Sequence, residues 1–401
     1  MFAKRTDWEL SENPLSLELN ALRAKGVPLF DLTASNPTQA GIVYPPELLA
    51  SFTDPANLVY APDPRGLRRA REAVACYYAD KHIELSPDDL VLTSSSSEAY
   101  TFLFRLLMDP HDRVLLPAPS YPLFSYLAGL NDVEVAYYRL FFDGEGWHID
   151  FDSLEEAAGR DAKAVVLVSP NNPTGSCVKP GEIERLNALC AARGMAIISD
   201  EVFADYIFDE GKAACRSLAA NTGALSFALG GLSKAMAMPQ MKLGWIAANG
   251  PRAQVRDALA RLEVIADTYL SVNTPVQNAA APWLSARALI RDQVMARVRT
   301  NYDHLRRMTP VAQPIAGTRT KLKGNFVHVP VEGGWYAVLK MDLGVPEDEW
   351  ALALLREQHV VVHPGFFFDF DEEGYVVVSL LTPEESFREG LRRMFTTKEG
   401  R

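Results

Sequence analysis

The sequence predicts an α/β fold in which a large domain, built around a mostly parallel sheet, is joined by a smaller α+β domain. Between about residues 90 and 250, short apolar runs alternate with amphipathic stretches, which is typical of parallel strands connected by helices. The chain of 401 residues is also too long for one small core and can enclose a sizeable site.

The large domain is expected to contain seven strands, each apolar almost throughout because helices cover both faces of a parallel sheet. The seven runs are "DLVLTS", "DRVLLPAP", "VEVAYYRL", "AKAVVLVSP", "MAIISDE", "ALSFALGG" and "KLGWIAA". Amphipathic stretches such as "KPGEIERLNALCAARG" supply the connecting helices.

The smaller domain follows a long helical region between Arg252 and Met308. Strands return at "GNFVHVPV", "GGWYAVLKMDL", "HVVVHPG" and "GYVVVSLL". The last segment, "TPEESFREGLRRMF", begins with a Thr-x-x-Glu capping box, which predicts an amphipathic helix that closes this unit.

The composition argues against several classes of function. A net charge of −11 and a pI near 5.2 do not suit a nucleic-acid or anionic-membrane surface, because both need a basic face. No apolar run approaches the roughly 20 residues of a membrane span. The N-terminus lacks a signal-peptide stretch, so we expect a soluble, cytoplasmic protein. The four cysteines and seven histidines show no spacing typical of a disulfide framework or a metal site.

Two lysines in the segment "GGLSKAMAMPQMKLGW" are the first sign of chemistry. Lys234 and Lys242 lie eight residues apart among small, apolar and sulfur-containing side chains. A lysine that loses hydration has a lowered pKa, so its neutral, nucleophilic amine becomes accessible near neutral pH. Taken alone, a lysine of this kind is much better explained as a surface residue whose stem lies on apolar neighbours.

Four other polar segments follow predicted strands, and ligands bind at the carboxyl ends of the strands in open α/β sheets. They are "SSSSE" (94–98), "SYP" (120–122), "SPNNPTG" (169–175) and "DEVFADY" (200–206). Each alone has a purely structural interpretation as a turn, a helix cap or a loop. Their common place at strand ends predicts one binding site.

With these segments, the chain resembles the class I and II aminotransferases, pyridoxal-phosphate enzymes of fold type I, from about Asp31 to the last helix. The resemblance implies transfer of an amino group between an amino acid and a 2-oxo acid, with pyridoxal 5'-phosphate as cofactor. It also implies a homodimer. Residues 41–284 would form the large cofactor-binding domain, and residues 1–40 with 285–401 the small domain.

Two alternatives stay open beside this interpretation. A pyridoxal-phosphate lyase, decarboxylase or other non-transaminating enzyme would use the same scaffold, since a fold does not fix a reaction. A ligand-sensing regulator fused to a DNA-binding domain is the least favoured, because the sequence before Asp31 offers neither the room nor a basic helix for it.

The resemblance assigns catalysis to two residues. Lys234 would hold the cofactor covalently through its amine and then, once substrate displaces it, carry a proton. Asp200 would pair with the protonated pyridine nitrogen and so keep the ring cationic and able to accept electrons.

Four further residues would contact the cofactor ring or stand close to it. Tyr121 would stack on the ring face, and Asn172 would donate its amide to the phenolate oxygen. Phe203 takes the place of a tyrosine that donates to the same oxygen in relatives. Tyr206, three residues further on, is the candidate substitute for that missing donor.

The phosphate of the cofactor is expected to lie where a serine-rich loop enters a helix, since backbone N–H groups and hydroxyls can bind it there. Lys242 would add a positive charge, in a place where most relatives carry arginine. The expected phosphate ligands are Ser95, Ser96, Ser97, Ser233, Lys242 and, reaching across the dimer, Tyr60.

The substrate end of the site departs from the family pattern. Relatives present an arginine two residues before a serine on a strand near the C-terminus, and alignment on Ser379 puts Val377 in that place. Because a desolvated carboxylate needs a charged partner, another cation is expected, and Lys340 is the first candidate. Ser35 and Asn36 are expected in a loop that contacts the substrate.

Overall fold

The computed structural model describes residues 1–208, 217–314, 322–323, 326–342 and 344–396. Its largest sheet has eight strands in the order β2-β9-β8-β7-β6-β3-β4-β5. The strands are β2 (Leu90–Thr93), β3 (Arg113–Ala118), β4 (Glu134–Phe142), β5 (Trp147–Ile149), β6 (Ala162–Val168), β7 (Ala196–Asp200), β8 (Ser226–Gly231) and β9 (Gly244–Asn249).

The central strands of this sheet are parallel, as predicted. β4, β3, β6, β7 and β8 pair in parallel, whereas β9 and β2 on one side and β5 on the other are antiparallel. All seven predicted strands are present, and the short β5 was not predicted. Because parallel strands end at the same edge, the segments after β3, β6, β7 and β8 gather there.

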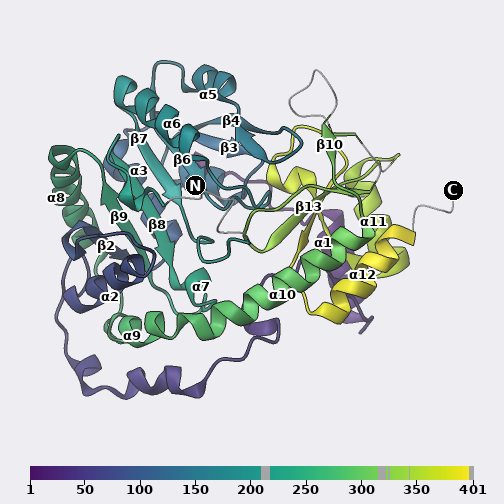
Figure 1. Cartoon of the computed structure of the whole chain (residues 1–401), viewed down its shortest axis with the longest axis horizontal. Helices are drawn as coiled ribbons and strands as arrows, with labels where there is room; N and C mark the ends of the chain where they lie inside the picture. Colours follow the sequence, from purple (N-terminus) through teal and green to yellow (C-terminus); the bar gives the residue numbers. More distant parts are fainter. Residues whose placement is uncertain (209–216, 315–321, 324–325, 343, 397–401) are drawn as a thin grey trace.

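Helices cover both faces of the large sheet (Figure 1). In β2, Val91 packs in the same core as α3 and α8, whereas Leu90 and Leu92 pack with α2 and α9. The α-helices are α1 (Pro14–Ala24), α2 (Arg68–Ala79), α3 (Ser96–Leu107), α4 (Leu123–Leu130), α5 (Phe151–Ala158), α6 (Pro180–Arg193), α7 (Leu232–Ala235), α8 (Arg252–Tyr269), α9 (Thr274–Ser285), α10 (Arg287–Met308), α11 (Glu347–Gln358) and α12 (Glu384–Thr396).

The smaller unit contains an antiparallel sheet of four strands in the order β12-β13-β16-β15. A parallel pair, β1–β14, joins the N-terminal segment to this unit, and the pair β10–β11 is antiparallel. The strands are β1 (Phe30–Asp31), β10 (Gln313–Pro314), β11 (Leu322–Lys323), β12 (Val327–His328), β13 (Tyr336–Lys340), β14 (Val360–Val361), β15 (His363–Pro364) and β16 (Tyr375–Ser379).

The long helix α10 runs from α9 beneath the large sheet to the smaller unit (Figure 1). The predicted closing helix is α12, and it packs against the same core as Leu32 from the N-terminal segment. These contacts support a smaller unit made from both ends of the chain, and the exact boundaries at residues 40 and 284 stay a prediction.

Two kinds of feature are absent from the described residues. No described helix is long and apolar enough to cross a membrane, and no described cluster of ligating side chains could hold a metal ion. Cys76 and Cys190 are free thiols. Cys215 lies outside the described residues.

Candidate active site

Lys234 lies on the short helix α7, three residues after the end of β8. Its ammonium is 5.4 Å from the ring centroid of Phe203 and 5.1 Å from that of Trp335. Burial lowers the pKa of Lys234, the positive charge of Lys242 lowers it further, and Asp200 opposes both effects. These surroundings are those of a lysine that is easily deprotonated, as the sequence predicted.

Asp200 is the last residue of β7 and is buried. One carboxylate oxygen accepts the backbone N–H of Val202 at 3.2 Å, and the other accepts the hydroxyl of Tyr100 at 3.2 Å. Burial raises the pKa of Asp200 to about 6, although these hydrogen bonds and Lys234 favour ionisation. A cation in contact with this carboxylate would therefore be strongly favoured.

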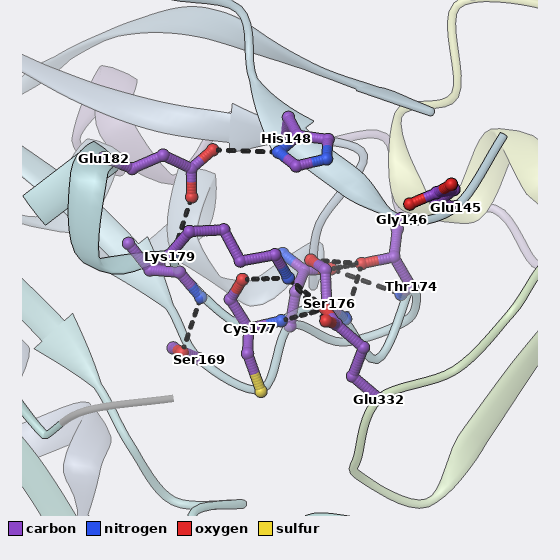
Figure 2. Close-up of polar contacts among 12 residues, drawn as sticks. Glu145, Gly146, His148, Ser169, Thr174, Ser176, Cys177, Lys179, Glu182 and Glu332 are labelled. Atoms are coloured by element: carbon purple, nitrogen blue, oxygen red, sulfur yellow. Dashed lines mark hydrogen bonds and ion pairs between the residues drawn. The ribbon is translucent and has the colours of Figure 1, made fainter. Parts of the chain in front are cut away.

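The loop after β6 carries Asn172 and is held by its own polar side chains (Figure 2). The amide oxygen of Asn171 accepts the backbone N–H and the hydroxyl of Thr174 at 3.3 and 3.0 Å. The Thr174 hydroxyl also lies 2.9 Å from that of Ser176. Asn172 is buried, and its amide oxygen has no partner among the described residues.

The same loop is fastened to the smaller unit by Glu332, which lies near the start of β13. Figure 2 shows the Lys179 side chain extending across the loop toward Glu332, and the two charges are 2.5 Å apart. The backbone N–H of Cys177 donates to Glu332 at 2.9 Å, and the N–H of Glu332 donates to Gly175 at 3.2 Å. The Asn172 loop is therefore held from both units.

Aromatic side chains line the space around Lys234. Phe203 is buried and meets the rings of Trp335 and Tyr336 edge-on, at 5.4 and 6.3 Å. Tyr336 hydrogen-bonds Ser35 and interacts with Tyr121. The sequence reasoning missed Trp335 and Tyr336, although the aromatic pair at the start of the predicted strand "GGWYAVLKMDL" was a usable signal.

Tyr121 is accessible for ligand binding, whereas the Asn36 side chain is engaged in a helix cap. Tyr121 is 43% exposed and meets the ring of Phe124 edge-on at 6.2 Å, so part of its ring is accessible to a ligand. Asn36 caps a short helix instead, because its amide oxygen accepts the N–H and hydroxyl of Thr38 at 3.1 and 2.7 Å. The structure therefore brings Ser35, but not the Asn36 side chain, to the aromatic cluster.

Tyr206 does not replace the hydroxyl that Phe203 lacks. Its hydroxyl donates to the backbone carbonyl of Lys234 at 2.7 Å, and the side chain is buried. The expectation that Tyr206 serves as a substitute donor is therefore wrong. Tyr206 instead fixes the backbone that carries the lysine.

The serine-rich loop enters a helix as predicted, because α3 begins at Ser96. The Ser95 hydroxyl caps this helix by accepting the N–H of Glu98 at 3.1 Å. A Cβ atom on Gly244 would lie 3.0 Å from the Ser95 carbonyl carbon, so glycine permits a close approach here. This approach brings the loop of Ser95, Ser96 and Ser97 to the start of β9.

Ser233 and Lys242 complete the predicted phosphate group on this chain. Ser233 is the second residue of α7, and Lys242 lies just before β9 and is exposed. Neither side chain has a hydrogen bond or ion pair within the described part of the chain. Both are free to bind an anion, and Lys242 is close enough to lower the pKa of Lys234.

Tyr60 lies between η4 (Pro55–Leu58) and α2, and its side chain is 80% exposed. Figure 1 shows the preceding segment running along the lower edge of the molecule, beneath α9. No described interaction joins Tyr60 to the other predicted site residues of its own chain. A role for Tyr60 therefore depends on a second chain.

The strand near the C-terminus has no cation at the predicted place. Val377 lies in the middle of β16 and is fully buried. Lys340 does not substitute for it, because its ammonium donates to the Glu373 carbonyl and lies 3.6 Å from Glu372. Lys340 is also at the opposite end of β13 from Tyr336, so the expectation that it binds the substrate carboxylate is wrong.

These residues fit pyridoxal 5'-phosphate. The buried Asp200 interacts with the charge of Lys234 but forms no ion pair among the described residues, and a protonated pyridine nitrogen would supply one. Asn172 is buried, and its amide nitrogen makes no hydrogen bond within the described chain, so it can donate to the phenolate oxygen. The start of α3 and the free ammonium of Lys242 suit a phosphate.

The sequence profile described as "Aminotransferase class I and II" matches residues 30–393. The chain belongs to this family. Its members use pyridoxal 5'-phosphate, and the aminotransferase is therefore a pyridoxal-phosphate enzyme that transfers an amino group.

Curated relatives resemble this aminotransferase over most of their length. A glutamate-pyruvate aminotransferase of Haemophilus influenzae is 26% identical, with 95% of this chain and 93% of the relative aligned. An alanine aminotransferase of Mycobacterium tuberculosis is 27% identical, with 89% and 82% aligned.

Solved structures share the fold of the whole aminotransferase chain. An alanine aminotransferase from Pyrococcus furiosus aligns over 100% of both chains with a TM-score of 0.87 and 23% identity. An aspartate aminotransferase from Thermotoga maritima does so with a TM-score of 0.82 and 23% identity. The large mostly parallel sheet and the smaller unit are thus the fold of pyridoxal-phosphate aminotransferases.

Proposed function

We propose that Lys234 carries pyridoxal 5'-phosphate covalently and that the aminotransferase moves an amino group from an amino acid to a 2-oxo acid at this lysine. When bound, the cofactor accepts electrons from the substrate carbon that carries the amino group. The observation that carries the proposal is the lowered pKa of a lysine held among aromatic rings, close enough to Asp200 for their charges to interact.

Each neighbouring residue has a separate task in this proposal. Asp200 holds a proton on the pyridine nitrogen, and Asn172 donates its amide to the phenolate oxygen. Tyr121 covers one face of the ring and excludes water from it. The amine of Lys234, once substrate displaces it from the cofactor, would take the proton from the amino-bearing carbon of the substrate and carry it.

The phosphate would be held by the start of α3 together with Ser233 and Lys242. The exposed Tyr60 would come from the partner subunit. Several apolar side chains near Tyr60 are unusually exposed, and such a surface is typical of an interface. They are Leu49, Phe52, Leu58 and Val59. A homodimer with two-fold symmetry would cover this surface and complete two equivalent sites.

The names of the relatives favour small substrates. The two curated relatives described above are named for alanine, or for glutamate and pyruvate, and we propose a small amino acid as donor and a 2-oxo acid as acceptor for this chain. A cytoplasmic location stays the prediction made from the sequence.

Spectroscopy with donor alone tests the reaction. An amino acid added without acceptor should convert the bound cofactor stoichiometrically into its amine form. Release of carbon dioxide or of ammonia without that conversion would instead identify a decarboxylase or a lyase.

Mixing two inactive variants tests the shared site. Lys234→Ala keeps a native Tyr60, and Tyr60→Phe keeps a native Lys234, so a heterodimer of the two regains one intact site. Partial recovery of activity on mixing is expected. A fully active monomer would refute the contribution of Tyr60 across the interface.

A further inference from the structure

An amino acid and a 2-oxo acid both carry a carboxylate beside the reacting carbon, and a desolvated carboxylate needs a positive partner. Among the described residues, the cations near the aromatic cluster are already engaged. Lys234 and Lys242 serve the cofactor in our proposal. Arg297 donates to the carbonyl of Ala40 at 3.0 Å and lies 3.8 Å from Glu384.

The sheet of the smaller unit offers one further candidate, next to Val377. On β16, Val377 is paired with Val338 of β13 on one side and with His363 of β15 on the other. Directly opposed residues in an antiparallel pair project to the same face, with Cβ atoms about 5 Å apart. His363 is therefore the immediate polar neighbour of Val377 on this face.

His363 packs on a segment that is hydrogen-bonded to the expected cofactor-binding segment around Tyr121. Its ring lies 6.0 Å from that of Phe367 and 5.8 Å from that of Phe368. The carbonyl of Phe368 accepts the backbone N–H of Ser120 at 2.9 Å, one residue before Tyr121. The segment that packs on His363 is thus hydrogen-bonded to the segment that would stack on the cofactor.

His363 also lacks a polar partner of its own. Its imidazole makes no hydrogen bond or ion pair within the described chain, although the side chain is partly buried. The hydroxyl of Ser120 is buried and likewise has no partner there. Two unpaired polar groups on neighbouring segments are expected where a ligand supplies the partners.

We propose that His363 is a specificity-determining residue of the aminotransferase, and that its imidazolium binds the substrate carboxylate in place of the cation missing at Val377. The proposal rests on the aminotransferase function proposed above. No covalent bond to carbon changes in this step. A proton from solvent joins the imidazole as the carboxylate binds.

The charges around His363 set the pH range of this effect. Burial lowers the pKa of His363, while Asp31 on β1 raises it. Strand β16 and the segment after β15 present Val377, Phe367 and Phe368, which carry no charge. Helix α11 also packs on β15, and its buried Glu347 accepts the backbone N–H of Phe366 at 3.3 Å. Because the imidazole is then mostly neutral at pH 7, a carboxylate binds only with proton uptake. Its affinity should fall about tenfold for each pH unit above the pKa of His363.

The test uses 2-methylalanine, an amino acid without a hydrogen on the amino-bearing carbon, so that it binds to the holoenzyme without turnover. Calorimetry at pH 7.5 in two buffers of different ionisation enthalpy gives the number of protons taken up. The parent should take up about one proton more per site than His363→Gln. His304→Gln is the matched control, because burial also lowers the pKa of His304 on α10, far along the chain from β15.

Two further measurements separate a binding role from a structural one. Val377→Arg should tighten 2-methylalanine by about 10- to 100-fold, the range of a charge-assisted hydrogen bond, and abolish the extra proton uptake. With 2-methylalaninamide, which has no carboxylate, the parent and His363→Gln should bind alike. Unchanged visible spectra of the bound cofactor show that each variant has folded.

Equal proton uptake by the parent and His363→Gln would overturn the role of His363. Unchanged affinity in Val377→Arg would overturn the placement of the carboxylate at β16. Failure of the proposed function gives a different result: an amino acid that carries a hydrogen on the amino-bearing carbon would then leave the parent's cofactor unconverted to its amine form, whatever the proton uptake with 2-methylalanine.

Discussion

Replacement of Asp200 by asparagine should stabilise the cofactor-free chain in a pH-dependent way. Burial raises the pKa of Asp200 from 3.8 to about 6. A difference of about two pKa units makes ionisation of this carboxyl about 3 kcal/mol more costly in the folded chain than in the unfolded chain. In the apoprotein, no pyridinium ion offsets this cost.

The sign of the pH dependence follows from proton binding. Between about pH 4 and pH 6 the folded chain keeps the Asp200 proton that the unfolded chain has lost. The free energy of unfolding of the parent therefore falls as pH rises through this window and stays about 3 kcal/mol lower above it. The Asp200→Asn variant escapes this loss, because an amide side chain has no proton to lose in this range.

Urea unfolding of both apoproteins at pH 4 and at pH 8 is the assay. The stability difference between Asp200→Asn and the parent should grow by about 2 to 3 kcal/mol from the lower to the higher pH. Any constant effect of the amide on packing cancels in this comparison. A difference that stays flat with pH would refute the reasoning.

Asp205→Asn is the matched control for this experiment. The Asp205 side chain is also buried, but it lies 2.9 Å from the ammonium of Lys81 and accepts the Tyr77 hydroxyl at 2.8 Å. Its replacement leaves a cation without its partner, so it should destabilise the chain at pH 8. With cofactor restored, Asp200→Asn should be on the order of 100-fold slower than the parent, since the ring nitrogen has lost a charged partner.

Three other substitutions test the remaining assignments. Lys234→Ala should lose the visible absorbance of the lysine–cofactor adduct and all turnover with little change in unfolding midpoint; a borohydride-trapped adduct in this variant would show that another lysine is the anchor. Lys242→Ala should bind cofactor about 10- to 100-fold more weakly, measured by its release on dilution, and equal retention would dismiss the phosphate role. Phe203→Tyr should lower the midpoint of the pH-dependent cofactor absorbance by about one to two units, because the new hydroxyl donates to the phenolate oxygen; an unmoved midpoint would mean that another donor already serves it.

Most of the fold was predictable from local patterns. The buried strands β6, β7 and β8 are apolar over most of their length, because the sheet is covered on both faces. The three-residue strand β5 was missed, since "WHI" is too short to show a period. The pairing of β1 with β14 joins residues more than 300 positions apart, and no local pattern encodes such a contact.

The site was predictable where a residue follows a strand, and not where contacts depend on tertiary structure. Asp200 and Lys234 were found because they lie at the end of β7 and just after β8. The sequence could not show that the Tyr206 hydroxyl points to the backbone of Lys234. Nor could it show that Glu372 engages Lys340, because the two lie on different segments of the smaller unit.

The attachment of the Asn172 loop to the smaller unit bears on how the protein melts. Gly175 accepts backbone N–H groups from Glu332 and Gly333 at 3.2 and 3.0 Å, and its left-handed conformation, with φ of +69°, leaves no room for a side chain. Separation of the two units would break these hydrogen bonds to the Asn172 loop, which would contact the cofactor. Heat or protease should therefore not release an intact, cofactor-loaded large domain, and loss of the cofactor and of the smaller unit should occur in one cooperative transition.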